Sequence, residues 1–94
     1  MTTELDRLHS LYLYIDRCRI LDNLKKRICS LEDLVDALDR DIEEAKMMGL
    51  DAGQLEEMCA SRNSIDQIKI ELALKANEIE HYILLFQQTI YSED

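Results

Sequence analysis

The stretch AKMMGLDAGQL, residues 45–55, decides how this chain folds. Gly49 stands where a helix would end, because glycine enters the left-handed backbone conformation without steric cost. Asp51 is a good N-cap for a second helix, and Gln54 follows three residues later, in the spacing of a capping box. The stretch therefore predicts a tight turn at 49–51 between two helices.

The composition agrees with long helices on both sides of this turn. The chain has 94 residues, no proline and two glycines, while 47% of its residues are apolar and 33% are charged. Such a balance is typical of long helices, and a β-sandwich would need many more turn residues. The expected organisation is a single all-α domain over residues 1–94, with one helix at about 4–48 and another at about 52–91.

Apolar residues recur along both predicted helices in alternating steps of three and four. This spacing continues for more than four heptads in the second helix, which predicts a coiled-coil-like seam. The seam of the first helix consists of Leu24, Ile28, Leu31, Val35, Leu38, Ile42 and Ala45. The seam of the second consists of Leu55, Met58, Arg62, Ile65, Lys69, Leu72, Ala76, Ile79, Ile83, Phe86 and Ile90. The predicted fold is an antiparallel helical hairpin.

The N-terminal part of the first helix has a different phase. Leu5, Leu8, Tyr12 and Ile15 form a stripe that, if continued, reaches charged residues, so the phase slips between Cys18 and Leu24 and the helix could be interrupted near 18–30. A phase slip of this kind requires a stutter or a kink. Two alternatives follow: one continuous helix with an N-terminal extension, or a separate third helix.

The turn also sets which residues face each other across the hairpin. Arg62 should lie near Asp39 and Asp41, and Lys69 near Asp33, so that both basic residues in the seam meet carboxylates and fix the register. The alternative is that both side chains extend along the helix to reach solvent.

Charge and targeting features narrow the function class. Eleven Lys and Arg against 20 Asp and Glu give a net charge of −9, which disfavours nucleic acid and anionic membrane surfaces. No apolar run has the length of a membrane span, and the first residues do not resemble a secretory signal. Three cysteines without metal-ligand spacing are typical of free thiols in a reducing compartment. We therefore expect a cytoplasmic protein that does not insert into membranes.

The sequence predicts no catalytic, cofactor-binding or metal-binding residue. Glu78 and His81 have the Glu-x-x-His spacing of di-iron helical bundles, but those sites need two such motifs and two further glutamates. The two histidines are not part of a recognisable nucleophile motif. The sequence also contains no glycine-rich phosphate-binding loop. The expectation is a protein that is not an enzyme.

The end of the hairpin far from the turn carries more apolar residues than two helices can cover. Residues 11–15 are apolar all round, and so are residues 82–86, which should lie beside them. A helix that is apolar on every side must be buried on every side. A folded-back third helix, a second copy of the chain or a different protein could cover the surplus. The residues predicted to bind a partner are Leu8, Leu11, Tyr12, Ile15, Tyr82, Leu85 and Phe86.

The central part of the chain, about residues 31–72, has a pattern that consists of Leu34, Leu38, Glu44, Gly49, Leu50, Gln54, Leu55 and the apolar stripe through Leu72. This pattern resembles the small co-chaperones of type III secretion needle subunits. The chain differs from that family in lacking a proline after the turn and in its longer second helix. Members of this family bind a tetratricopeptide-type chaperone, and together they keep the needle subunit monomeric in the bacterial cytoplasm.

The resemblance implies that the N-terminal apolar residues face the partner chaperone. The predicted function is accordingly that of a non-enzymatic, protein-binding co-chaperone in a hetero-oligomer. The alternative is a structural coiled-coil subunit of a larger assembly.

Overall fold

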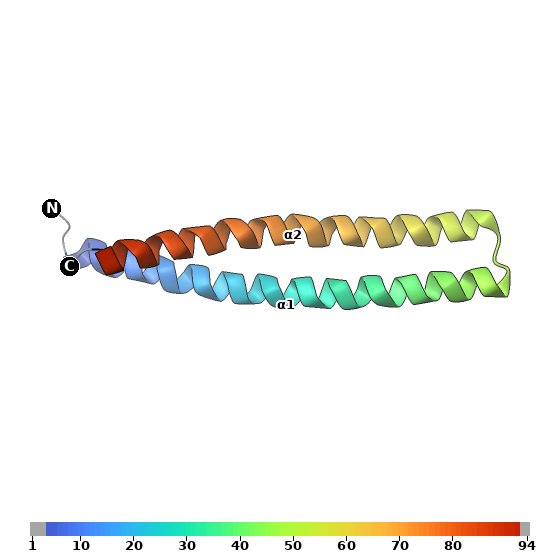
Figure 1. Ribbon diagram of the computed structural model, residues 1–94, viewed down its shortest axis with the longest axis horizontal. Coiled ribbons are helices and arrows are strands. Elements are labelled where there is room, and N and C mark those ends of the chain that lie inside the picture. The colour runs from blue at the N-terminus through green and yellow to red at the C-terminus, as the bar shows by residue number, and fades with distance from the viewer. Residues whose placement is uncertain (1–3, 93–94) are drawn as a thin grey trace.

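The computed structural model describes residues 4–92, with side chains to Thr89, as two long helices joined by a short turn (Figure 1). Helix α1 spans Glu4–Met48 and helix α2 spans Ala52–Ser92. They run antiparallel in a rod with extents of 70 × 17 × 14 Å, and the first residues of α1 lie at the same end as the last residues of α2. The predicted all-α antiparallel hairpin is confirmed, and no strand occurs within 4–92.

Helix α1 ends in a Schellman motif, as the glycine predicted. Gly49 has a φ of 77°, which is the left-handed region that other residues enter at a cost. Its N–H donates to the Lys46 carbonyl at 3.2 Å, and the Leu50 N–H donates to the Ala45 carbonyl at 3.1 Å. These two bonds satisfy carbonyl groups that the end of a helix otherwise leaves unpaired.

Helix α2 begins at the predicted cap. The Gln54 backbone N–H donates to Asp51 Oδ1 at 2.8 Å, and the Leu55 N–H donates to the Asp51 carbonyl at 3.1 Å as the first helical bond. The turn is thus held from both sides by hydrogen bonds local to residues 45–55, so it does not depend on packing elsewhere.

Substitutions at the turn should therefore have specific costs. Gly49→Val should lower the free energy of unfolding by about 1 kcal/mol or more, because a β-branched residue resists positive φ. Asp51→Ala should lower it by about 0.5–2 kcal/mol through loss of the cap. Urea denaturation measures both, and variants as stable as the parent would contradict the assignment of the turn.

Substitution of Gly53, the other glycine, should instead stabilise the hairpin. A Cβ atom added there would lie 3.4 Å from Asp51 Oδ1, an ordinary contact, and Gly53 has no positive φ. Gly53→Ala should raise the free energy of unfolding by about 0.4–1 kcal/mol, because alanine loses less entropy on entering a helix. Thermal melting checks this, and a lower melting temperature would contradict it.

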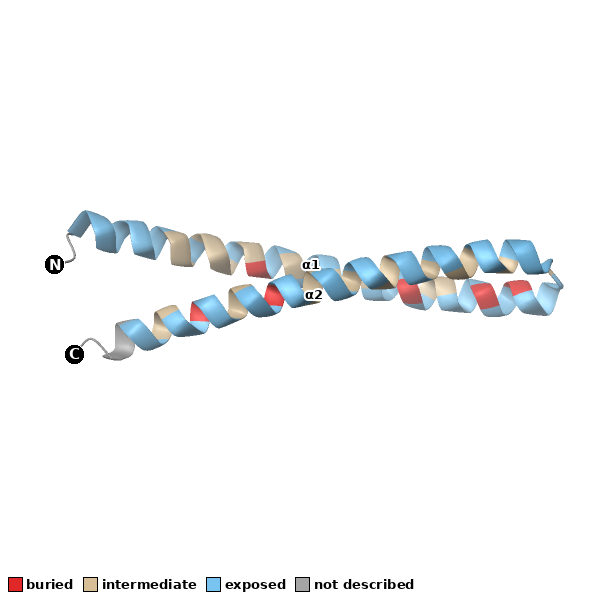
Figure 2. Ribbon diagram, turned by 90° about the horizontal axis from the view of Figure 1, so that it is seen from above, coloured by how far each residue is buried: buried red, intermediate tan, exposed pale blue. Residues whose placement is uncertain are grey.

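The two seams form the predicted contact between the helices. Every described residue of both seams is buried or half-buried, and only the side chain of Ile90 lies outside the described part. Figure 2 shows the helices crossing near the middle and diverging toward the termini. The core is thin, and its most buried residues, each between 4% and 8% exposed, are Leu21, Val35, Ile42, Ala45, Ala76 and Ile83.

The phase change in α1 is explained without a break in the helix. α1 is continuous from Glu4 to Met48, so the first of the two alternatives is found, with neither an interruption near 18–30 nor a separate third helix. The inner seam instead continues upstream from Leu24 through Leu21 to Tyr14, which is half-buried. The N-terminal stripe, including Tyr12, lies on the opposite face. Two stripes on two faces of one continuous helix give the same sequence pattern as a kink.

Candidate functional site: a protein-binding surface

An aromatic contact holds the two helices together near the open end of the hairpin, away from the turn. The rings of Tyr14 and Phe86 stack with centroids 4.9 Å apart and planes inclined by 20°. Gln87 Nε2 donates a hydrogen bond of 3.0 Å to the Tyr14 hydroxyl. Offset stacking adds about 0.5–1.5 kcal/mol to the stabilisation from buried area. These interior contacts therefore hold α1 and α2 together near the open end.

Two charged contacts also join the helices in this half of the hairpin. The Arg17 guanidinium carbon lies 5.9 Å from the centre of the Tyr82 ring, which is within the range of a cation–π contact. Lys25 Nζ lies 3.2 Å from a carboxylate oxygen of Glu80, and both side chains are about half exposed. These contacts join α1 to α2 and orient the outer faces of the two helices.

A strip of large apolar side chains lies on the other face of α1 at this end. We call it the α1 outer strip, and Tyr12 and Ile15 in it are 65% and 59% exposed. Scattered exposed leucines are normal on a protein surface, but a contiguous strip indicates an interaction site. The α1 outer strip consists of Leu5, Leu8, Leu11, Tyr12 and Ile15.

Six of the seven residues predicted to bind a partner are exposed. Four of them belong to the α1 outer strip, and Tyr82 and Leu85 are exposed on α2 beside Leu84. Phe86 lies apart from these six, because it is half-buried against Tyr14 inside the hairpin. That the exposed residues bind a partner stays a prediction.

Sequence reasoning missed Tyr14 as a residue of the hairpin interior. The same antiparallel pairing that brings Arg62 to Asp39 also brings Tyr14 to Phe86, so the register itself could have found the contact. The apolar character of residues 11–15 on all sides hid which of its two tyrosines faces inward.

The register is confirmed at Arg62. Arg62 Nε donates to Asp39 Oδ1 at 2.9 Å, and its Nη2 lies 3.5 Å from Asp39 Oδ2. The hydrogen bond from Arg62 to Asp39 raises the pKa of Arg62 above its usual value. Lys69 instead pairs with Asp66 on its own helix at 3.2 Å, and no ion pair with Asp33 is observed among the described residues.

This bridge supports a double-mutant cycle. Arg62→Glu should destabilise the hairpin by like-charge repulsion with Asp39, and adding Asp39→Arg should recover part of the loss. We expect a coupling free energy of about 0.3–1 kcal/mol by urea denaturation, because both groups are partly solvated. A smaller coupling would mean that the bridge contributes nothing in solution.

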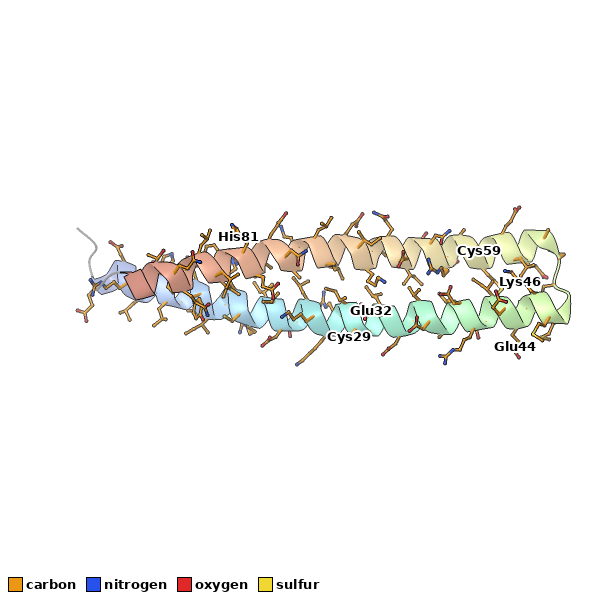
Figure 3. All side chains as sticks on the ribbon, in the orientation of Figure 1. Cys29, Glu32, Glu44, Lys46, Cys59 and His81 are labelled. Carbon is orange, nitrogen blue, oxygen red and sulfur yellow. The ribbon has the colours of Figure 1, made fainter. Side chains whose placement is uncertain are left out.

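Titratable and thiol groups do not gather at this surface. Cys29, Cys59 and His81 lie far apart along the hairpin (Figure 3), and all three cysteines are free thiols. Glu78 pairs with Lys75 at 3.5 Å. Within residues 4–92, no group of three or more His, Cys, Asp or Glu side chains is placed to hold a metal ion.

Neither helix, over its described residues, has a segment long and apolar enough to cross a membrane.

A shallow hollow of about 320 Å³ lies over the middle of the hairpin, lined by Lys26, Arg27, Ser30, Leu31 and Leu72. No protein-family model, curated protein or solved structure matches the chain.

Proposed function

We propose that this chain is a non-enzymatic protein-binding module of the cytoplasm, a co-chaperone for a type III secretion needle subunit. The observation that carries the protein-binding role is the α1 outer strip. Its five large apolar side chains lie on a side of α1 that α2 does not cover, and Leu5 is 75% exposed. Burial of such a strip contributes about 25 cal/mol for each Å² of apolar surface.

The proposed partner has the chemistry of another helical surface. An apolar strip along one helix fits a groove that accepts residues at helical spacing, as in other complexes of a helix in a groove. Tetratricopeptide-type chaperones present helical grooves, and the resemblance to needle co-chaperones names this class. Tyr12 is the expected anchor, because exposed aromatic residues dominate many interfaces.

The charge around the strip favours an acidic rim on the partner. Arg17, Arg19, Lys25, Lys26 and Arg27 follow the strip within one short segment of a chain whose net charge is −9. A local reversal of sign next to an apolar strip steers a partner of opposite charge into one orientation.

Co-expression tests the proposal. The chain should be produced with the tetratricopeptide-type chaperone and the needle subunit encoded in the same genome, and the mixture passed over a sizing column. The expected result is one soluble complex of the three proteins in which the needle subunit stays monomeric. Needle filaments that form as readily with this chain as without it would contradict the co-chaperone role.

A structural coiled-coil subunit is the second candidate, favoured by the length of the rod. Two helices of 45 and 41 residues are long for a small adaptor and suit a spacer in a larger assembly. Such a subunit would stay bound in the mature assembly, whereas a co-chaperone would be absent from it. Mass spectrometry of the purified assembly distinguishes the two.

A further inference from the structure

Four residues of the α1 outer strip begin a longer line of exposed residues. Continuing from Ile15 in steps of four and three, the line follows the outer face of α1 to Met47 near the turn. Every residue on it is exposed, and Met47 is 89% exposed. The line consists of Leu5, Leu8, Tyr12, Ile15, Arg19, Asp22, Lys26, Cys29, Asp33, Asp36, Arg40, Glu43 and Met47.

This line has the spacing of a coiled-coil seam, but its middle is charged. A seam of this length has room for a second helix along the whole of α1. Charged residues in a seam are costly unless each meets an opposite charge. The identity of the occupant therefore depends on which sequence is complementary to the line.

The line is complementary to itself in the antiparallel direction. Two copies of α1 centred on Leu31 bring together residues equally distant from Leu31 on either side. In that arrangement each a position of one seam faces a d position of the other, as antiparallel coiled coils require. The facing pairs are Ile15 with Met47, Arg19 with Glu43, Asp22 with Arg40, Lys26 with Asp36 and Cys29 with Asp33.

Three of these pairs join opposite charges: Arg19 with Glu43, Asp22 with Arg40, and Lys26 with Asp36. Each pair occurs twice in the dimer because of its two-fold axis. The outermost apolar pair covers Met47, whose exposure is otherwise unexplained.

Neighbouring registers are less favourable. Sliding the two copies past each other by one heptad, so that the centre moves toward the N-terminus, places Asp22 opposite Asp33. The opposite slide, which moves the centre toward the turn, places Asp33 opposite Asp36. Of these three registers, only the one centred on Leu31 leaves no like charges facing each other.

We propose that the outer face of α1 binds a second copy of this chain, antiparallel and centred on Leu31. The result is a two-fold dimer with each α2 on the outside. In the single chain, Arg19 forms an ion pair with Asp16 at 2.7 Å, and Glu43 forms one with Lys46 at 3.3 Å, both within α1. Exposed pairs of this kind contribute little, so they exchange readily for contacts across the dimer.

The dimer does not depend on the proposed function. It describes the chain without other proteins. In it, Ile15 faces Met47 of the second copy and Tyr12 faces Leu50 in its turn, while Leu5 and Leu8 extend past the end of its α1. A protein that binds the whole α1 outer strip would replace the second copy.

Charge reversal at one facing pair tests both the dimer and its register. Arg19→Glu places two carboxylates opposite each other at two points, and Glu43→Arg does the same with two guanidinium groups. Each variant alone should weaken the dimer about tenfold or more in sedimentation equilibrium. Lys75→Glu, which makes the same charge change as Arg19→Glu at an exposed position of α2, is the matched control and should leave the dimer unchanged.

Mixing the two single variants gives the decisive result. In a mixed dimer, the carboxylate introduced by Arg19→Glu in one chain faces the guanidinium introduced by Glu43→Arg in the other. The native Arg19–Glu43 pair remains at the second point, so the mixture should recover native affinity. The double variant R19E/E43R should also dimerise. A monomeric parent chain, an equal effect of Lys75→Glu, or a mixture no tighter than the single variants would overturn the proposal.

Discussion

Tyr12→Asp should strongly weaken the complex with the proposed partner chaperone without unfolding the hairpin. The Tyr12 side chain is 65% exposed and lies outside the seam, so the new carboxylate stays in water when the chain is free. In the complex it would be buried without a counter-charge in place of an aromatic anchor. The expected loss of affinity is about 30- to 1000-fold, corresponding to about 2–4 kcal/mol, by isothermal titration calorimetry.

Tyr14→Asp is the matched control for that experiment, because it makes the same substitution two residues away on the other face. Tyr14 stacks on Phe86 and accepts a hydrogen bond from Gln87. Its replacement should lower the free energy of unfolding by about 3–5 kcal/mol, by analogy with truncation of other packed aromatics.

The two tyrosines thus separate binding from folding. The Tyr12 variant should keep the circular dichroism spectrum and melting temperature of the parent, whereas the Tyr14 variant should melt early. If the Tyr12 variant binds the chaperone as tightly as the parent does, the α1 outer strip is not the binding site.

The turn and the seam could be predicted from the sequence because each depends on local rules. Gly49 and Asp51 end and begin helices through hydrogen bonds within a few residues of themselves. The seam needs only a repeat of three and four, and the antiparallel register follows once the turn is placed. The Arg62–Asp39 bridge at 2.9 Å confirms that register at a point well away from the turn.

The N-terminal half of α1 was harder to predict because two stripes overlap in its sequence. An inner stripe through Tyr14 and Leu21 and an outer stripe through Tyr12 and Ile15 make residues 11–15 apolar on all sides. Periodicity reports that both stripes exist and does not say which one faces α2. That choice depends on the facing residues, and the stacking of Tyr14 on Phe86 is a tertiary contact.

The thin core between the helices predicts a second large loss of stability. Ile83 is 8% exposed and belongs, with Leu21 and Ala76, to the cluster that joins the helices in the open half of the hairpin. Ile83→Ala should lower the free energy of unfolding by about 2–5 kcal/mol, through lost burial and the cavity left behind. Leu84→Ala, one residue further on and 53% exposed, should change it by less than about 0.5 kcal/mol.

Hydrogen exchange should show where the loss in the Ile83 variant is felt. The half of the hairpin next to the turn has its own buried residues, Val35, Ile42 and Ala45, which do not depend on Ile83. The turn at Gly49 also keeps the two helices together there. Amides near both termini should therefore exchange faster in Ile83→Ala, while those around the turn should stay protected. Uniform loss of protection along both helices would mean that the hairpin unfolds as one unit. In the expected case, the Ile83 variant also binds the proposed partner chaperone more weakly, because α1 is no longer held against α2 in the half that carries Tyr12, whereas Leu84→Ala leaves that support intact.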